Sequence, residues 1–199
     1  MPVMNVMIPP QLKQRTLEFA QSIILDNNQF DRLLPADIRR ADNLDLSNAV
    51  RIQRTYVGKL GEVAFAQALI NRGVQVDFEP MFEIFQGQDN VDGFDFETAN
   101  NQTVDIKTGF RSNHRRLMVN LQQLNEPKNF YVGVKLNAID PDIKQKVINL
   151  DSIESATIYG YQTENTLLNT NRPQNFGEGD ARWLMYSNLR DINELLAQF

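Results

Sequence analysis

The spacing of hydrophobic residues changes near residue 73, which predicts a helical first part and a sheet-rich second part. Between residues 10 and 27, apolar residues recur three or four positions apart after Pro10, as in an amphipathic helix. A second helix is predicted from Ser47, as N-cap, to Gly73, as C-cap, and its apolar circumference predicts burial. The polar stretch between them contains Pro35 and has room for one short helix.

After Gly73, apolar and polar residues mostly alternate, as they do in strands. Strands are predicted at 74–85, interrupted at Pro80, and at 91–98, 102–108, 129–137, 156–163 and 181–187. Further helices are predicted at 163–169 and 187–199. This order predicts an α/β fold with a central mixed β-sheet flanked by helices. We expect an N-terminal helical arm and linker at 1–46 and one domain at 47–199.

Composition narrows the classes of protein that need considering. The chain of 199 residues has no cysteine, which excludes disulfides and thiolate metal sites. It contains no leader-like start and no apolar run of about 20 residues, so we expect a cytoplasmic protein without a membrane span. The net charge of −5 argues against a nucleic-acid partner, because such binders usually carry a basic surface, but a carboxylate site that binds a divalent cation is compatible with it.

Two neighbouring predicted strands each carry a polar pair opposite an apolar pair. In residues 102–108, Val104 and Ile106 alternate with Asp105 and Lys107. In residues 91–98, Phe94 and Phe96 alternate in the same way with Asp95 and Glu97. The apolar pairs are expected to face the core, and the sheet therefore holds the polar pairs as a rigid scaffold holds a site.

The length of the loop between these strands decides whether their acids meet. A three-residue loop at 99–101 places Asp95 opposite Asp105, whereas a two-residue turn places Asp95 opposite Ile106 and on the other face. Asparagine tolerates the left-handed backbone that a three-residue loop needs, which favours the first register. Two carboxylates about 5 Å apart repel strongly, and a divalent cation between them would relieve this repulsion.

Glu62 is a carboxylate within the mostly apolar predicted helix. A buried charge needs a partner, such as a lysine, an arginine or a metal-bound water. Gly58 and Gly61 would allow this helix to approach the sheet closely. Thr108 is a further candidate for the polar shell, although a cross-strand contact is the favoured explanation for it.

The order GKLGEVAFAQAL, DNVDGFDFE, TVDIKT resembles the PD-(D/E)XK nucleases, the restriction-endonuclease-like superfamily, over about residues 47–199. The resemblance implies that Asp95 is the first acid, Asp105 the second acid and Lys107 the lysine of the motif. It also implies that Glu62 is the acid found on the helix in many members. No proline precedes Asp95, and Asp92 therefore remains a rival for the first position.

The resemblance implies a Mg²⁺-dependent nuclease, with Mn²⁺ able to substitute. Asp95, Asp105, the carbonyl of Ile106 and Glu62 would hold the metal. Phosphodiester hydrolysis, a DNA endonuclease of restriction or repair type and a homodimer are the corresponding expectations. Four basic residues after the lysine strand are the expected nucleic-acid contacts: Arg111, His114, Arg115 and Arg116.

Two other functions fit the same residues. One is a non-catalytic nucleic-acid-binding or assembly module on the same fold. The other is a metal hydrolase acting on a small phosphorylated molecule, and a deep closed pocket beside Asp105 would favour it. Whether a nucleic-acid substrate is DNA or RNA stays open at this stage.

Overall fold

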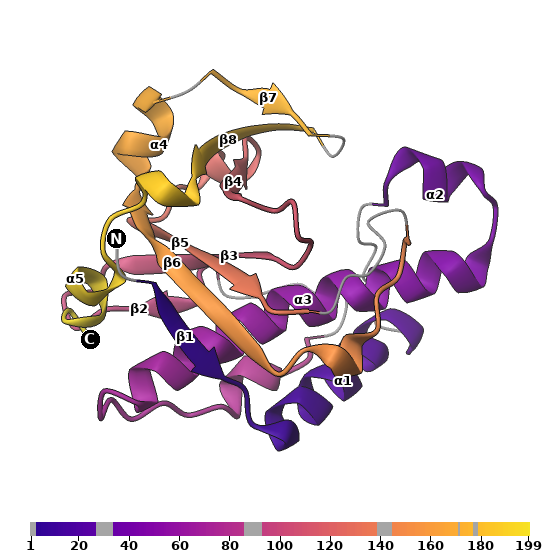
Figure 1. Cartoon of the computed structure of the whole chain (residues 1–199), viewed down its shortest axis with the longest axis horizontal. Helices are drawn as coiled ribbons and strands as arrows, with labels where there is room; N and C mark the ends of the chain where they lie inside the picture. The colour runs from indigo at the N-terminus through magenta and orange to yellow at the C-terminus, as the bar shows by residue number, and fades with distance from the viewer. Residues whose placement is uncertain (1–2, 27–33, 86–92, 139–144, 171, 177–178) are drawn as a thin grey trace.

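The computed structural model describes residues 3–26, 34–85, 93–138, 145–170, 172–176 and 179–199. A five-stranded sheet lies at its centre, in the order β1-β6-β5-β3-β2 (Figure 1). Its strands are β1 (Met4–Met7), β2 (Phe96–Glu97), β3 (Thr103–Gly109), β5 (Phe130–Leu136) and β6 (Ser155–Thr163). β3 and β5 are parallel, and the other neighbours are antiparallel. The predicted α/β fold with a central mixed sheet is confirmed.

Helices cover one face of this sheet (Figure 1). α3 (Leu44–Ile70) packs on the strands, α1 (Pro10–Leu25) packs beside α3, and α2 (Ala36–Arg40) contacts α3 at the end that extends away from the sheet (Figure 1). Leu60, Val63 and Phe65 of α3 are fully buried in one apolar cluster with Val104 and Ile106 of β3. No helix among the described residues is long and apolar enough to cross a membrane.

A smaller sheet, and not only helices, covers the opposite face. Its strands β4 (Arg116–Asn120), β8 (Asp180–Met185) and β7 (Gln174–Asn175) lie in that order, with α4 (Glu164–Thr170) beside β8. A second apolar cluster fills the space between the two sheets, and it contains Leu117, Tyr131, Leu184 and Leu189. β4 and β7 were not predicted, because β7 has only two residues and β4 carries an apolar residue, Met118, on its exposed face, which hides its alternation in the sequence.

The N-terminal arm is tied into the domain more closely than the sequence predicts. β1 pairs with β6 along all four of its residues, and buried Val6 joins the main core. α3 begins at Leu44, because the side chain of Asn43 accepts a hydrogen bond from the Leu46 amide at 3.0 Å and caps the helix. Ser47 is therefore not the N-cap, and the predicted boundary at residue 46 falls inside α3.

Residues 74–85 were predicted to form a strand, but they form none. They contain only a 3-10 helix, Pro80–Phe82, and the ring of Phe82 packs edge-on against Phe19 of α1 at 5.8 Å. The guanidinium of Arg15 lies over the same ring at 4.4 Å. The apolar residues of this segment thus pack on the helices without joining a ladder. Further 3-10 helices among the described residues are Gln123–Asn125, Leu150–Ser152 and Tyr186–Asn188.

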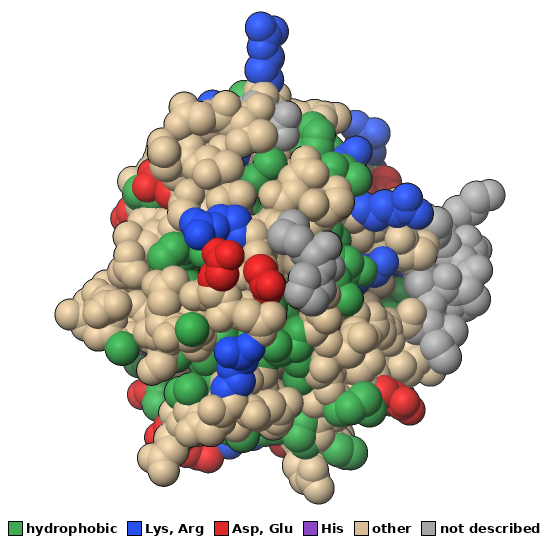
Figure 2. Space-filling view, turned by 60° about the vertical axis from the view of Figure 1, so that its left-hand side comes forward, with side chains coloured by type: hydrophobic (Ala, Val, Ile, Leu, Met, Phe, Trp, Pro, Cys, Tyr) green, Lys and Arg blue, Asp and Glu red, His purple; other side chains and the backbone are tan. Residues whose placement is uncertain are grey.

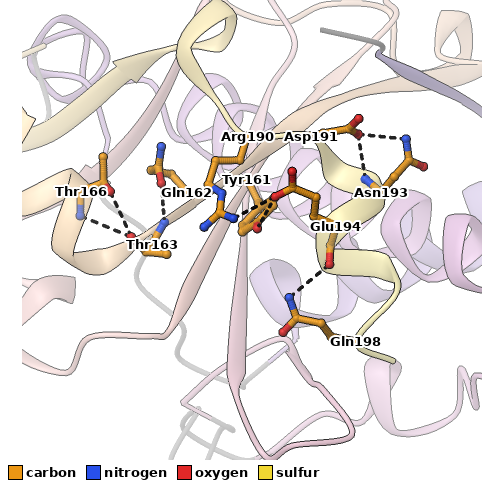
Figure 3. Close-up of polar contacts among 9 residues, drawn as sticks. All are labelled: Tyr161, Gln162, Thr163, Thr166, Arg190, Asp191, Asn193, Glu194 and Gln198. Atoms are coloured by element: carbon orange, nitrogen blue, oxygen red, sulfur yellow. Dashed lines mark hydrogen bonds and ion pairs between the residues drawn. The ribbon is translucent and has the colours of Figure 1, made fainter.

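The C-terminal segment is fastened to β6 instead of forming one long helix. α5 spans only Ile192–Leu196. Tyr161 and Arg190 exchange two backbone hydrogen bonds of 3.1 and 2.8 Å, and the carboxylate of Glu194 accepts from the Tyr161 hydroxyl and the Arg190 guanidinium (Figure 3). Because Arg190 is paired with β6, the helix begins only at Ile192, and its buried leucines lie against the core.

Candidate functional site

The β2–β3 hairpin has the register that a three-residue loop produces. Phe96 lies opposite Val104 and Glu97 opposite Thr103, and the Thr98 amide donates to the Gln102 carbonyl at 3.0 Å. Asn101, in the loop, has the left-handed φ of +57°. Continued by one residue, this register is the one that the sequence predicted to place Asp95 opposite Asp105, although β2 begins only at Phe96.

Asp95 lies in irregular chain immediately before β2. Its amide donates to the Val104 carbonyl at 3.0 Å, and its Oδ2 accepts from the Ile106 amide at 2.6 Å. The carboxylate thus occupies the place of the next carbonyl in the ladder. Because the N–H and C=O groups of one strand residue point to the same side, the carbonyl of Ile106 lies on the side of β3 that faces Asp95. The carboxylate of Asp95 and the carbonyl of Ile106 are therefore two oxygen groups on the same side of β3 that could act as metal ligands.

Two other carboxylates act on the charge of Asp95. Burial raises the pKa of Asp95 well above its ordinary value, and the charges of Glu62 and Asp105 raise it further. The hydrogen bond from Ile106 and the charge of Lys107 act in the opposite direction and are the smaller effects. The site therefore concentrates negative charge that a proton or a cation would neutralise.

Asp105 and Lys107 form an ion pair on the sheet face away from α3. Nζ of Lys107 lies 2.6 Å from Oδ2 of Asp105, and each side chain is only 16% exposed. Val104 and Ile106 alternate with them and pack in the α3 core, as predicted. The pair is thus held in a largely buried environment, where its electrostatic interactions are screened less than on the surface.

Glu62 reaches the site from α3, where the helix and sheet approach closely. A Cβ on Gly61 would lie 1.9 Å from the Thr108 hydroxyl oxygen, so glycine is required there. Glu62 Oε2 accepts from Lys59 Nζ at 2.5 Å, which gives this carboxylate a lysine partner. Thr108 faces α3, on the other side of the strand from Asp105, and it is not part of the polar shell around Asp105.

The sheet adds polar residues that the sequence did not single out. Asp105 lies level with Tyr131 of β5, and Tyr131 lies level with Gln162 of β6, so a polar row crosses the strands. Burial raises the pKa of Tyr131, and the charges of Asp105 and Glu164 contribute to the rise. Only the parallel β3–β5 register could reveal this row, since the apolar character of 129–137 suggested a purely structural strand.

Two of the four predicted nucleic-acid contacts instead hold the β3–β4 connection together. Arg111 is buried, and its guanidinium donates to the backbone carbonyls of Gln145 and Lys146. Nδ1 of His114 accepts from the amides of Phe110 and Arg111 at 3.1 and 3.3 Å. Both side chains are explained by loop structure, and the prediction that Arg111 is a surface phosphate contact is corrected by its burial.

The other two basic residues, Arg115 and Arg116, are exposed. Arg116 begins β4, so the connection leads directly from the lysine strand to these side chains. Asp92, the alternative first acid, lies outside the described residues. Asp95 is therefore the first-acid candidate whose position can be stated.

No group of three or more histidine, aspartate or glutamate side chains in the described part of the chain is arranged to hold a metal ion. The predicted ligand set contains three carboxylates, Asp95, Asp105 and Glu62, and they do not form such a group in this structure. Carboxylate and carbonyl oxygens are the donors that Mg²⁺ prefers, so the chemistry of Asp95, Asp105 and Ile106 fits this ion.

A pocket of about 630 Å³ lies elsewhere, between β1, the start of α1 and the end of α3. Lys13, Asn71 and Glu154 are among its lining residues, and none of the candidate acids lines it. This pocket therefore gives no support to a small-molecule site beside Asp105. The chain matches no family model, no curated protein and no solved structure.

Replacing Asp95 with asparagine is expected to stabilise the metal-free protein near neutral pH. Asparagine keeps an oxygen that can accept from the Ile106 amide but carries no charge to be repelled by Glu62 and Asp105. We expect a gain on the order of 1 kcal/mol, or about 2–4 °C in Tm. Thermal unfolding without metal tests this.

The stability advantage of Asp95→Asn over wild type should become smaller as the pH is lowered. The folded-state pKa of Asp95 is raised, so the native protein binds the extra proton more readily and wild type recovers stability as the pH falls through that pKa. A loss of stability in Asp95→Asn near neutral pH would contradict the charge repulsion inferred for this site.

Proposed function

We propose that the protein is a metal-dependent nuclease of the PD-(D/E)XK type that hydrolyses phosphodiester bonds. The observation that carries the proposal is the hydrogen bond that holds the Asp95 carboxylate at the Ile106 amide of β3, the strand that carries the Asp105–Lys107 pair. The influence of Glu62 and Asp105 on Asp95 adds support, since a shared cation site requires carboxylates in electrostatic reach of one another.

In this proposal Asp95, Asp105 and the Ile106 carbonyl would hold Mg²⁺ or Mn²⁺, and Glu62 would hold an associated water. The bound ion would neutralise phosphate charge and lower the pKa of a water molecule. Lys107 would donate a hydrogen bond to the attacking water or to a phosphate oxygen and stabilise the charge that develops there. Its ion pair with Asp105 keeps the amine beside the metal ligands.

DNA is the proposed substrate, cut by an endonuclease of restriction or repair type. A homodimer is the corresponding proposal, because one site cuts one strand. The direct test is incubation with plasmid, linear duplex, single-stranded DNA and RNA, with Mg²⁺, with Mn²⁺ and with a chelator. Metal-dependent cleavage that disappears in Asp105→Asn would support the proposal, whereas no cleavage of any of these substrates would count against it.

A non-catalytic nucleic-acid-binding module is the second candidate. The observation that favours it is the Asp105–Lys107 ion pair, because a lysine already neutralises this carboxylate without a metal. The two candidates differ in their response to divalent cations, which are essential to the first and irrelevant to the second.

Magnesium or manganese is expected to raise the Tm of the wild-type protein. A cation that binds only the folded state stabilises it by RT ln(1 + [L]/Kd), which is about 2.7 kcal/mol at a concentration 100 times Kd. For a chain of this size we expect a rise of roughly 2–4 °C per kcal/mol. Differential scanning calorimetry over a range of metal concentrations measures the effect.

Asp105→Asn is the matched variant for this experiment, since it removes one proposed ligand charge with little change in volume. Its Tm should respond to magnesium far less than that of wild type. Equal shifts in the two proteins would show that the metal binds elsewhere, and the absence of a shift in wild type would favour the non-catalytic module.

A further inference from the structure

The small sheet carries a basic side chain between two aromatic rings. The guanidinium carbon of Arg116 lies 4.9 Å from the ring centre of Trp183 and 5.4 Å from that of Phe176. The two rings pack edge to face, with their centres 6.2 Å apart. We call Arg116, Phe176 and Trp183 the aromatic platform. Cation–π contacts of this kind hold a guanidinium against aromatic faces.

Strand register places the platform on the outer face of the small sheet. Trp183 pairs with Met118 of β4, which is 37% exposed, whereas the next pair, Leu117 and Leu184, is buried in the core between the sheets. Because side chains alternate along a strand, Arg116, Met118 and Trp183 share the face turned away from that core. Flat apolar groups and a cation are thus combined on an outer surface.

Arg116 of the platform follows the candidate site closely in the sequence. β3 carries Asp105 and Lys107 and ends at Gly109, and the loop that follows leads into β4 at Arg116. Arg115, immediately before the platform, is also exposed. Arg115 and Arg116 therefore supply positive charge beside the aromatic rings for the phosphates of a bound single strand.

We propose that the aromatic platform binds single-stranded nucleic acid by stacking unpaired bases on Trp183 and Phe176, with Arg116 and Arg115 contacting its phosphates. Aromatic rings interleaved with basic side chains are the combination that binds single strands without sequence preference. In a duplex, neighbouring base pairs already cover the base faces, so the platform discriminates against duplex. The inference deepens the proposed nuclease function, on which it rests for the chemistry that follows binding.

The distribution of charge favours stacking over phosphate contacts as the main source of affinity. The net charge of the chain is −5, and Figure 2 shows a face where acidic and basic side chains are interspersed, without a continuous basic stripe among the described residues. Within the three strands of the small sheet, Asp180 is the one acidic residue. Stacking adds affinity that does not depend on counterion release.

Trp183 is the only tryptophan in the chain, so its fluorescence reports directly on the platform. The experiment titrates the full-length protein, with chelator to prevent cleavage, with an oligothymidylate, an oligouridylate and a duplex of equal length. We expect both single strands to quench Trp183 and the duplex to bind more weakly. Binding without quenching, tighter binding of the duplex, or no binding of either single strand would overturn the proposal.

Variants test whether stacking supplies the affinity. Trp183→Leu should weaken binding of a fluorescently labelled single strand by about tenfold, and Trp183→Phe, which keeps an aromatic ring, should weaken it much less. Arg15→Ala is the matched control, because it removes another cation–π contact, with Phe82, far from β4 in the sequence, and it should leave affinity unchanged. Equal affinity of wild type and Trp183→Leu would overturn the proposal.

Two results separate this proposal from the nuclease. If Trp183→Leu fails to fold, Phe176→Leu takes its place with the same expected direction and the same overturning outcome. Quenching by single strands in a protein that cleaves nothing would support the platform and reject the nuclease. Metal-dependent cleavage without any quenching would reject the platform alone.

Discussion

Lys107→Ala is expected to lower the rate of cleavage by a factor on the order of 100 or more, under saturating magnesium. In the proposed mechanism the amine stabilises charge that develops in the transition state, and it is not a metal ligand. Metal binding should therefore survive, and the loss of positive charge beside Asp105 should if anything favour the cation. Single-turnover cleavage and calorimetric metal titration of the same preparation measure the two effects.

Lys146→Ala is a matched control for this change. Lys146 also pairs with an aspartate, Asp37, but both side chains are about half exposed, and exposed pairs contribute little. Cleavage by this variant should equal that of wild type. If Lys107→Ala also cleaves at the wild-type rate, the lysine has no catalytic role, and the proposed nuclease would have to depend on other residues.

The hairpin that carries Asp95 and Asp105 could be predicted from the sequence because local chemistry determines it. Alternation in 102–108 assigns the faces of β3, and the asparagines at 100 and 101 favour the left-handed residue observed at Asn101. The buried helix carrying Glu62 was predictable for a similar reason, since its pattern is long. β1 and β7 were not predictable, because strands of four and two residues carry too little periodicity.

Side-chain partners depend on tertiary contacts, and the sequence could not indicate them. Glu62 bonds to Lys59 of its own helix, and Arg111 turns inward to the carbonyls of residues 145 and 146, more than thirty positions away. Tyr131 and Gln162 enter the row beside Asp105 only through the β3–β5–β6 register. A sequence motif can predict the residues of a site from their local spacing. The side chains that surround the site depend on the register of strands that are distant in the sequence.

Gly133 and Gly160 lie opposite each other on β5 and β6, and together they receive the C-terminal segment. A Cβ on Gly133 would lie 2.8 Å from Leu189, and a Cβ on Gly160 would lie 2.2 Å from the backbone carbonyl oxygen of Arg190. Lys107 is level with Gly133 in the adjacent strand, so this close packing borders the candidate site. Leu189 and Tyr186 can pack closely over β5 and β6 because Gly133 and Gly160 have no side chain.

Gly160→Ala is therefore expected to destabilise the protein by about 3 kcal/mol or more, which corresponds to a fall of roughly 6–12 °C in Tm. Two effects add. Gly160 has φ +146°, which L-residues rarely adopt, and the new Cβ would collide with backbone atoms that cannot move aside as a flexible side chain can. The collision would also break the hydrogen-bonded pairing of Tyr161 with Arg190. Thermal and denaturant unfolding of the variant measure the loss.

Gly73→Ala separates the two effects, because Gly73 also has a positive φ, +86°, but nothing lies within 4 Å of its added Cβ. We expect the free energy of unfolding of this control to fall only by the conformational penalty, about 1–2 kcal/mol. The difference between the two variants then measures the collision with Arg190. Equal losses would mean that the C-terminal segment does not press on β6 at Gly160, and that its attachment depends on the side-chain contacts of Tyr161 and Glu194 alone.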